Sequence, residues 1–127
     1  MSPEVKHVLV IDDDRFILEI IIEILQREGY SVEGTQNGQL ALEALNRDPL
    51  PDLILLDLMM PEMDGFQFRE QQLQSPRIQA IPTVVMSADG AAHKNSQRLS
   101  GAYYLKKPID LETLLETVKR FAFAKAG

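Results

Sequence analysis

The sequence predicts an α/β fold in which five parallel strands alternate with five helices to form a doubly wound sheet. Near-continuous apolar runs, typical of strands buried on both faces, occur at residues 8–11, 53–56 and 83–86. Apolar residues recur at helical spacing over residues 17–25 and 111–122. Because these strand and helix signals alternate along the chain, they favour right-handed βαβ crossovers.

Weaker signals complete the pattern. Residues 31–35 and 102–105 are less apolar, so we expect these strands toward the edges of the sheet. Two further helices are expected over residues 38–47 and 65–75. Residues 90–99 have Leu99 as their one large apolar residue and predict a short helix at most.

Length and composition limit the classes of function. The chain has 127 residues, 45% of them hydrophobic and 25% charged, and no internal linker, so we expect one domain over residues 5–124 without an output domain. The net charge of −6 and the lack of a Lys/Arg cluster argue against binding to nucleic acid. The absence of cysteine excludes disulfides and thiolate metal sites. Without a signal peptide or membrane-length apolar run, we expect a cytoplasmic protein with no membrane insertion.

Charged residues follow three of the predicted strands. Asp12 and Asp13 come directly after the first strand, Asp57 after the third and Lys107 after the fifth. In doubly wound sheets, ligands bind beyond the carboxyl ends of the strands. We therefore expect these four side chains to converge on one pocket.

Three carboxylates close together repel one another by several kcal/mol, at an effective dielectric constant of about 20. A hard divalent cation relieves this repulsion, and Mg²⁺ fits oxygen ligands that include few carboxylates and a phosphate oxygen. Calcium is disfavoured because no loop has EF-hand spacing. An aspartate in such a site can act as a nucleophile toward a phosphoryl group, and Asp57 is placed best for this role.

Taken singly, several of these residues have ordinary structural explanations. Asp14 and Asp64 are typical helix N-caps, and Asn37 can cap the helix that follows it. Lys106 is expected to be a solvated charge. An aspartate after one strand is weak support for a site, so the hypothesis depends on convergence from three strand ends.

Four segments in order then identify a family resemblance: VLVIDDDR, LILLDLMMPEMDGFQF, VVMSA and YYLKKPI. Together they closely resemble the receiver domain of two-component response regulators, of the chemotaxis-regulator type, from about Val5 to Phe121. The resemblance implies a flavodoxin-like (βα)5 fold with helices on both faces of a sheet of strand order 2-1-3-4-5. It also implies a sensor histidine kinase or phosphotransfer protein as phosphoryl donor, and a downstream protein target.

The same resemblance assigns roles to residues. Asp57 is the implied phosphoryl acceptor, and Lys107 pairs with the phosphoryl oxygens. Asp13, Asp57 and the backbone carbonyl of Met59 are the implied direct ligands of Mg²⁺, while Asp12 acts mainly through water.

A conformational switch is implied as well. Ser87 hydrogen-bonds the phosphoryl group, and Tyr104 turns inward as Ser87 moves. The alternatives are a hydroxyl that satisfies the backbone and a static half-buried aromatic ring. The Lys107-Pro108 bond is expected to be cis. The chain is also about two residues shorter than is usual in the family between Ser87 and Lys107, and this shortening falls within residues 90–99.

Three other functions compete with this interpretation. A phosphatase of the haloacid dehalogenase type needs a second acid two residues after the nucleophile, where this chain has Met59. A flavin-binding flavodoxin needs a neutral phosphate loop after the first strand, where three carboxylates stand. A receiver that binds partners as a scaffold without phosphorylation is the strongest alternative, and phosphorylation of the purified protein discriminates it.

Overall fold

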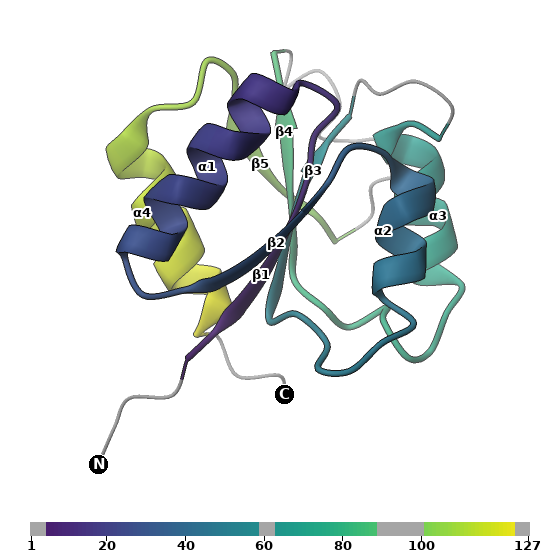
Figure 1. Cartoon of the computed structure of the whole chain (residues 1–127). Helices are drawn as coiled ribbons and strands as arrows, with labels where there is room; N and C mark the ends of the chain where they lie inside the picture. The colour runs from purple at the N-terminus through teal and green to yellow at the C-terminus, as the bar shows by residue number, and fades with distance from the viewer. Residues whose placement is uncertain (1–4, 59–62, 89–100, 124–127) are drawn as a thin grey trace.

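The structure is a computed structural model that describes residues 5–58, 63–88 and 101–123. Strands and helices alternate along most of the chain (Figure 1). In chain order they are β1 (His7–Ile11), α1 (Arg15–Arg27), β2 (Ser31–Thr35), α2 (Gly38–Ala44), β3 (Leu53–Asp57), α3 (Gly65–Leu73), β4 (Thr83–Ser87), β5 (Tyr103–Lys106) and α4 (Leu111–Ala122). The five predicted strands and four of the predicted helices are confirmed, and the helix expected over residues 90–99 lies outside the described residues.

All neighbouring strands are parallel, in the order β2-β1-β3-β4-β5. This order confirms that the weaker strands β2 and β5 occupy the edges. Ile11 pairs with Leu56, and Asp57 pairs with Met86, so the carboxyl ends of β1, β3 and β4 lie together at one edge of the sheet. This edge is where the sequence predicts the site.

Alternate residues of the central strands enter two separate cores. Val8 and Val10 face α1 and α4, whereas Leu9 and Ile11 face α2 and α3. Figure 1 shows the two helix pairs on opposite sides of the twisted sheet. Burial on both faces explains the continuous apolar runs, because neither face of these strands contacts water.

Both middle helices end earlier than expected, α2 at Ala44 rather than residue 47 and α3 at Leu73 rather than residue 75. For α3 the reason is Pro76, because the residue before a proline, here Ser75, is disfavoured in helical conformation. The described part of the chain has no helix with the length and apolar character needed to cross a bilayer.

Candidate functional site

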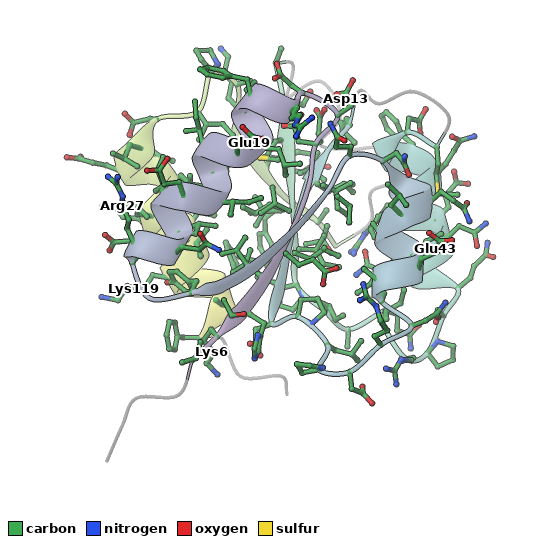
Figure 2. The ribbon with its side chains drawn as sticks, in the orientation of Figure 1. Lys6, Asp13, Glu19, Arg27, Glu43 and Lys119 are labelled. Atoms are coloured by element: carbon green, nitrogen blue, oxygen red, sulfur yellow. The ribbon has the colours of Figure 1, made fainter. Side chains whose placement is uncertain are left out.

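The first strand carries two aspartates to the edge of the sheet. The backbone N–H of Asp12 donates to the carbonyl of Thr35 at 3.1 Å, which extends the pairing of β1 and β2. The Asp12 carboxylate is fully buried, and its Oδ1 accepts the backbone N–H of Asp14 at 2.9 Å. Asp13 is exposed beside it, at the end of the molecule where α1 begins (Figure 2).

Asp57 is the last residue of the central strand β3 and is buried. Helix α3 begins directly against this strand end: a Cβ atom on Gly65 would lie 2.7 Å from both the carbonyl oxygen of Asp57 and the Cα of Leu58. The glycine therefore permits a close approach that holds the helix N-terminus beside the acidic residue.

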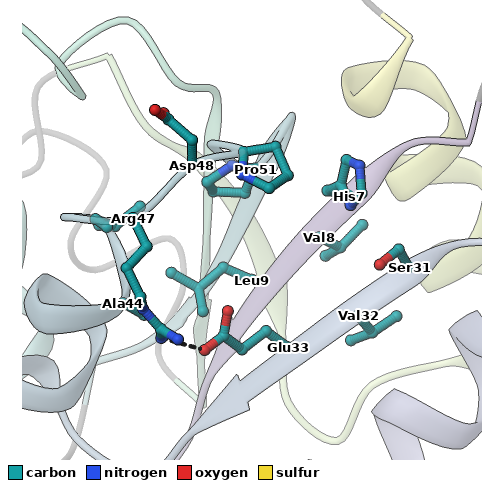
Figure 3. Close-up of a pocket in the computed structure, with 12 residues that line it drawn as sticks. His7, Val8, Leu9, Ser31, Val32, Glu33, Ala44, Arg47, Asp48 and Pro51 are labelled. Atoms are coloured by element: carbon teal, nitrogen blue, oxygen red, sulfur yellow. Dashed lines mark hydrogen bonds and ion pairs between the residues drawn. The ribbon is translucent and has the colours of Figure 1, made fainter.

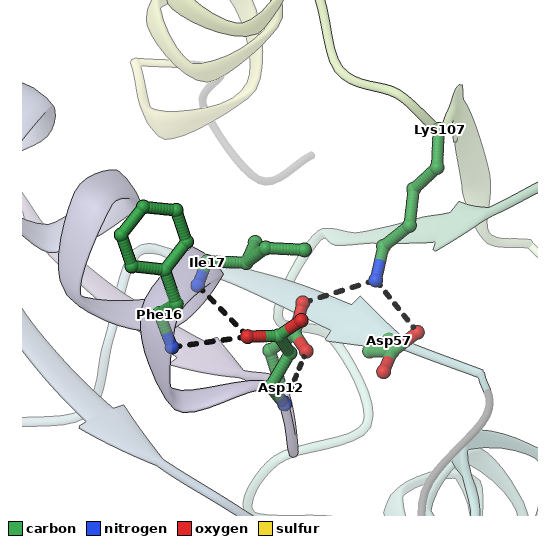
Figure 4. Close-up of polar contacts among 6 residues, drawn as sticks. Asp12, Phe16, Ile17, Asp57 and Lys107 are labelled. Atoms are coloured by element: carbon green, nitrogen blue, oxygen red, sulfur yellow. Dashed lines mark hydrogen bonds and ion pairs between the residues drawn. The ribbon is translucent and has the colours of Figure 1, made fainter.

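Lys107 brings a cation to the same place from the edge strand β5. Its backbone N–H donates to the carbonyl of Ser87 at 3.0 Å. Its ammonium donates to Asp12 Oδ2 at 3.1 Å and to Asp57 Oδ1 at 3.2 Å, so one Lys bridges two carboxylates (Figure 4). The cis bond predicted between Lys107 and Pro108 is confirmed. We call Asp12, Asp13, Asp57 and Lys107 the acidic pocket.

Two groups of the acidic pocket, Asp57 and Lys107, have shifted pKa values. Burial raises the pKa of Asp57 to about 7, and the neighbouring Asp12 carboxylate adds to the effect, while Lys107 opposes it. Burial alone would lower the pKa of Lys107, but Asp12 and Asp57 together raise it above its ordinary value. The ammonium therefore stays charged, while Asp57 carries a charge that its surroundings disfavour.

This charge imbalance suits a divalent cation. Asp12, Asp13 and Asp57 each offer a carboxylate oxygen, and these oxygens lie within 4.8 Å of one another. Oxygen ligands in such a cluster match the preference of Mg²⁺. The predicted fourth ligand, the carbonyl of Met59, lies outside the described residues.

The ordinary structural roles expected for single residues are observed. Asp14 accepts two N–H groups of the first turn of α1, at 3.0 and 3.2 Å. Asn37 caps α2, and Asp64 caps α3 in a capping box. Lys106 is exposed.

The two residues of the predicted switch lie on neighbouring strands. Ser87 is buried at the end of β4, one position after Met86, which pairs with Asp57. Tyr104 is half-buried on β5, where it pairs with Val85 and packs against the core that faces α2 and α3. Their places fit the implied roles, and whether they move stays a prediction.

An apolar groove beside the acidic pocket differs from what helical periodicity suggests. The periodicity places Ile20 on the buried face of α1, yet Ile20 is 40% exposed, and the buried residues are Leu18, Ile21 and Leu25. The apolar stripe is wider than the core requires, and its excess lines a groove of about 490 Å³ that we call the α1 groove. Its walls include Ile17, Ile20, Ile24, Lys107, Pro108 and Ile109.

A second buried polar cluster was missed by reasoning from composition. Arg69, Gln72 and Thr83, here called the Arg69 cluster, are all buried between α3 and β4. The available signal was spacing, since Gly65, Phe68 and Gln72 share one helix face at intervals of three and four residues.

Another hollow, of about 250 Å³, lies at the opposite end of the sheet, between the start of β1 and the end of α2 (Figure 3). Arg47 and Glu33 form an ion pair across it at 2.9 Å, and both side chains are largely exposed. Exposed pairs of this kind contribute little free energy. The converging charges therefore favour the acidic pocket as the functional site.

Comparisons with known proteins cover most of the chain. The family model for the response regulator receiver domain matches residues 8–119. Protein PilH of Pseudomonas aeruginosa is 34% identical over 88% of this chain and 93% of its own length. The DNA-binding dual master transcriptional regulator RpaA of Synechocystis is 37% identical, but the chain spans 47% of that protein. The chemotaxis response regulator CheY4 of Vibrio cholerae has a structure with a TM-score of 0.84 and 30% identity, over 93% of this chain and 99% of that one.

Proposed function

The chain belongs to the response regulator receiver domain family, and on this premise we propose that Asp57 accepts a phosphoryl group from a histidine kinase or phosphotransfer protein. Receiver domains are signalling domains, so the proposed chemistry is limited to the protein's own phosphorylation and dephosphorylation. The observation that carries the proposal is the Lys107 ammonium, which lies 3.2 Å from Asp57 and 3.1 Å from Asp12 at the end of the central strand. The proposed domain covers residues 5–124.

The proposed reaction is a substitution at phosphorus. A carboxylate oxygen of Asp57 forms the new P–O bond, the P–N bond of a phosphohistidine breaks, and the departing imidazole nitrogen takes up a proton. Lys107 is fixed where it can bind the transferred oxygens, so its charge is in place before transfer begins. The Asp57 carboxylate must be ionised to attack.

We propose that Asp12, Asp13 and Asp57, with the carbonyl of Met59, hold Mg²⁺ for this reaction. When bound, Mg²⁺ neutralises carboxylate charge and binds a phosphoryl oxygen. The chain itself supplies the fixed acidic side chains and the ammonium. Both carboxylate oxygens of Asp12 already accept hydrogen bonds, one from the Asp14 backbone and one from Lys107. This supports the expectation that Asp12 contacts the metal ion mainly through water.

The proposed output is a packing change at the neighbouring strands. Phosphorylated Asp57 would attract the Ser87 hydroxyl, and Tyr104 would turn into the space that becomes available. Ser87 ends the strand that pairs with β3, and Tyr104 lies on the next strand, which supports this coupling.

A protein donor needs a surface beside the acidic pocket, and the α1 groove offers one. The groove is continuous with the pocket through Lys107, which lines both. Its isoleucines and Pro108 suit an apolar helix face of the partner. We therefore place the phosphoryl donor there, and propose that the output target is a protein, consistent with a net charge of −6 that disfavours nucleic acid.

The test is intact-mass measurement after incubation with Mg²⁺ and acetyl phosphate. The parent protein should gain one phosphoryl group, and Asp57→Asn should gain none. Asp48→Asn, which alters an aspartate exposed on the surface, should behave as the parent. A folded parent protein that gains no mass would instead support the scaffold receiver, which binds partners without phosphorylation.

A further inference from the structure

Helix α3 buries a positive charge that the proposed reaction does not use. Arg69 is 4% exposed, although arginine is rarely buried so completely. Its Nη1 donates to Gln72 Oε1 at 2.7 Å and to Thr83 Oγ1 at 3.0 Å. Desolvation lowers the pKa of Arg69, but a guanidinium remains charged in proteins. A full positive charge therefore lies inside the fold.

The hydrogen-bond partners of Arg69 are themselves held in place. Gln72 Nε2 donates to the carbonyls of Ile78 and Ile81 at 3.1 and 3.2 Å. The Thr83 hydroxyl lies 3.1 Å from Gln72 Oε1 and from the carbonyl of Ile81. Because each anchor is bonded in turn, the guanidinium has little freedom to move relative to the start of β4.

On its other side, the guanidinium faces β5. A Cβ atom on Gly101 would lie 3.3 Å from Arg69 Nη2, and Gly101 has a φ of +77°, so the chain enters β5 directly over the charge. Tyr104 lies on the same face of the sheet: it pairs with Val85, two residues after the Thr83 that binds Arg69, and Val85 and Tyr104 pack in the core that faces α2 and α3. In agreement with this placement, burial raises the pKa of the Tyr104 phenol, and Arg69 counteracts part of that rise.

A charged residue at a core position breaks the pattern by which helices bury apolar side chains, and such breaks are concentrated at functional sites. We propose that Arg69 is a positioning residue for Tyr104: its anchored guanidinium holds the phenol ring beside α3 and so sets how readily the ring changes place. This inference rests on the proposed function, because it gives Tyr104 a switching role.

The proposed effect is modest and directional. We expect about a two- to fivefold change in the population of one ring position, which corresponds to roughly 0.5–1 kcal/mol. Removing the charge should therefore free the ring. Restoring a charge with lysine should recover only part of the effect, because lysine lacks the planar fork that Thr83 and Gln72 hold.

The composition makes Tyr104 easy to observe. The chain has three tyrosines and no tryptophan. In a Tyr30→Phe, Tyr103→Phe background, Tyr104 is the remaining source of tyrosine fluorescence and of phenol absorbance. Both replacements keep the aromatic ring, so the stacking of residue 103 on Phe121 is retained.

In this background, Arg69→Met should raise the pKa of Tyr104 by about 0.5 and increase the quenching of its fluorescence by acrylamide at neutral pH. Arg69→Lys should give intermediate values, and Arg77→Met, which alters an arginine that is 45% exposed, should change neither. If Arg69→Met does not fold, Thr83→Val replaces it, and a smaller change in the same direction is expected.

Unchanged Tyr104 titration and quenching in a folded variant would overturn the inference. Quenching that rises equally in Arg69→Met and Arg69→Lys would also overturn it, since loosened packing rather than charge would then be the cause. These measurements use no phosphoryl donor, so they do not depend on whether Asp57 accepts a phosphoryl group.

Discussion

Among the described residues, Arg69 is buried and Lys107 is partly buried, and these two positive charges are held differently. In the acidic pocket, Lys107 contacts the carboxylates Asp12 and Asp57, and its side chain is still 22% exposed. In the Arg69 cluster, the guanidinium is hydrogen-bonded to neutral oxygens and enclosed. The first site has strong charges with an excess of negative ones, whereas the second holds its positive charge through hydrogen bonds to the neutral side chains of Gln72 and Thr83.

This difference separates a reactive site from a positioning site. A carboxylate whose pKa is raised to about 7 by burial and by a like charge is poised to gain a cation or a phosphoryl group. A guanidinium anchored by a glutamine and a threonine is instead fixed in place, and any partner that is removed leaves a buried charge poorly solvated. Deleting one polar group should therefore lower the free energy of unfolding in the Arg69 cluster and raise it in the acidic pocket.

The largest effect is expected in the Arg69 cluster. Gln72→Leu should lower the free energy of unfolding by about 3 kcal/mol, because Arg69 loses an acceptor and the carbonyls of Ile78 and Ile81 lose a donor. Urea denaturation measures this loss. Gln71→Leu, at an exposed neighbouring position, is the matched control and should change stability by less than about 0.5 kcal/mol.

The double variant Arg69→Met, Gln72→Leu tests whether the loss of stability comes from the buried charge. Removing both partners together leaves no buried charge to satisfy, so the double variant should be more stable than Gln72→Leu alone. A double variant that loses the sum of both single effects would show that the cluster is not one coupled unit.

In the acidic pocket, deletion of a charge should stabilise. The folded-state pKa of Asp57 is about 7 and its ordinary value is 3.8, so the folded protein binds this proton more tightly than the unfolded chain does. Stability is therefore lost as pH rises from about 4 through about 7. Asp57→Asn should raise the free energy of unfolding by about 2 kcal/mol at pH 8 without divalent cations, and by much less at pH 4.

Thermal denaturation across this pH range provides the measurement, with Asp48→Asn as an exposed control that should show no such trend. Added Mg²⁺ should stabilise the parent protein more than Asp57→Asn at pH 8. A gain in stability that is the same at both pH values would argue against the buried charge as its cause.

The smallest effect on stability is expected in the α1 groove, where burial of charge plays no part. Ile20→Asp should leave the free energy of unfolding within about 0.5 kcal/mol of the parent value. It should slow phosphoryl transfer from a phosphohistidine protein and leave labelling by acetyl phosphate unchanged, because a small donor needs no docking surface. Leu40→Asp, at a residue that is 46% exposed on α2, should change neither rate.

Much of this architecture follows from the sequence because its signals are local. Apolar runs mark the strands, and topology alone brings Asp12 and Asp57 to one edge. The burial of Arg69 and Gln72 was not predicted, because polar residues are assigned to the surface by residue type. Their spacing, however, places them on the buried face of α3. The exposure of Ile20 was missed for the opposite reason, since periodicity identifies an apolar stripe but not how much of it the core covers.

The strand order also distributes the charges of the acidic pocket unevenly. Asp12 follows the interior strand β1 and Asp57 ends the interior strand β3, whereas Lys107 follows β5 at the margin of the sheet. Fraying of β5 would pull the Lys107 ammonium away and leave the two carboxylates facing each other. The attraction between the ammonium and the carboxylates therefore stabilises the outer strand. Hydrogen exchange in β5 should then depend on the charge of Asp57, two strands away, and of Asp12, three strands away.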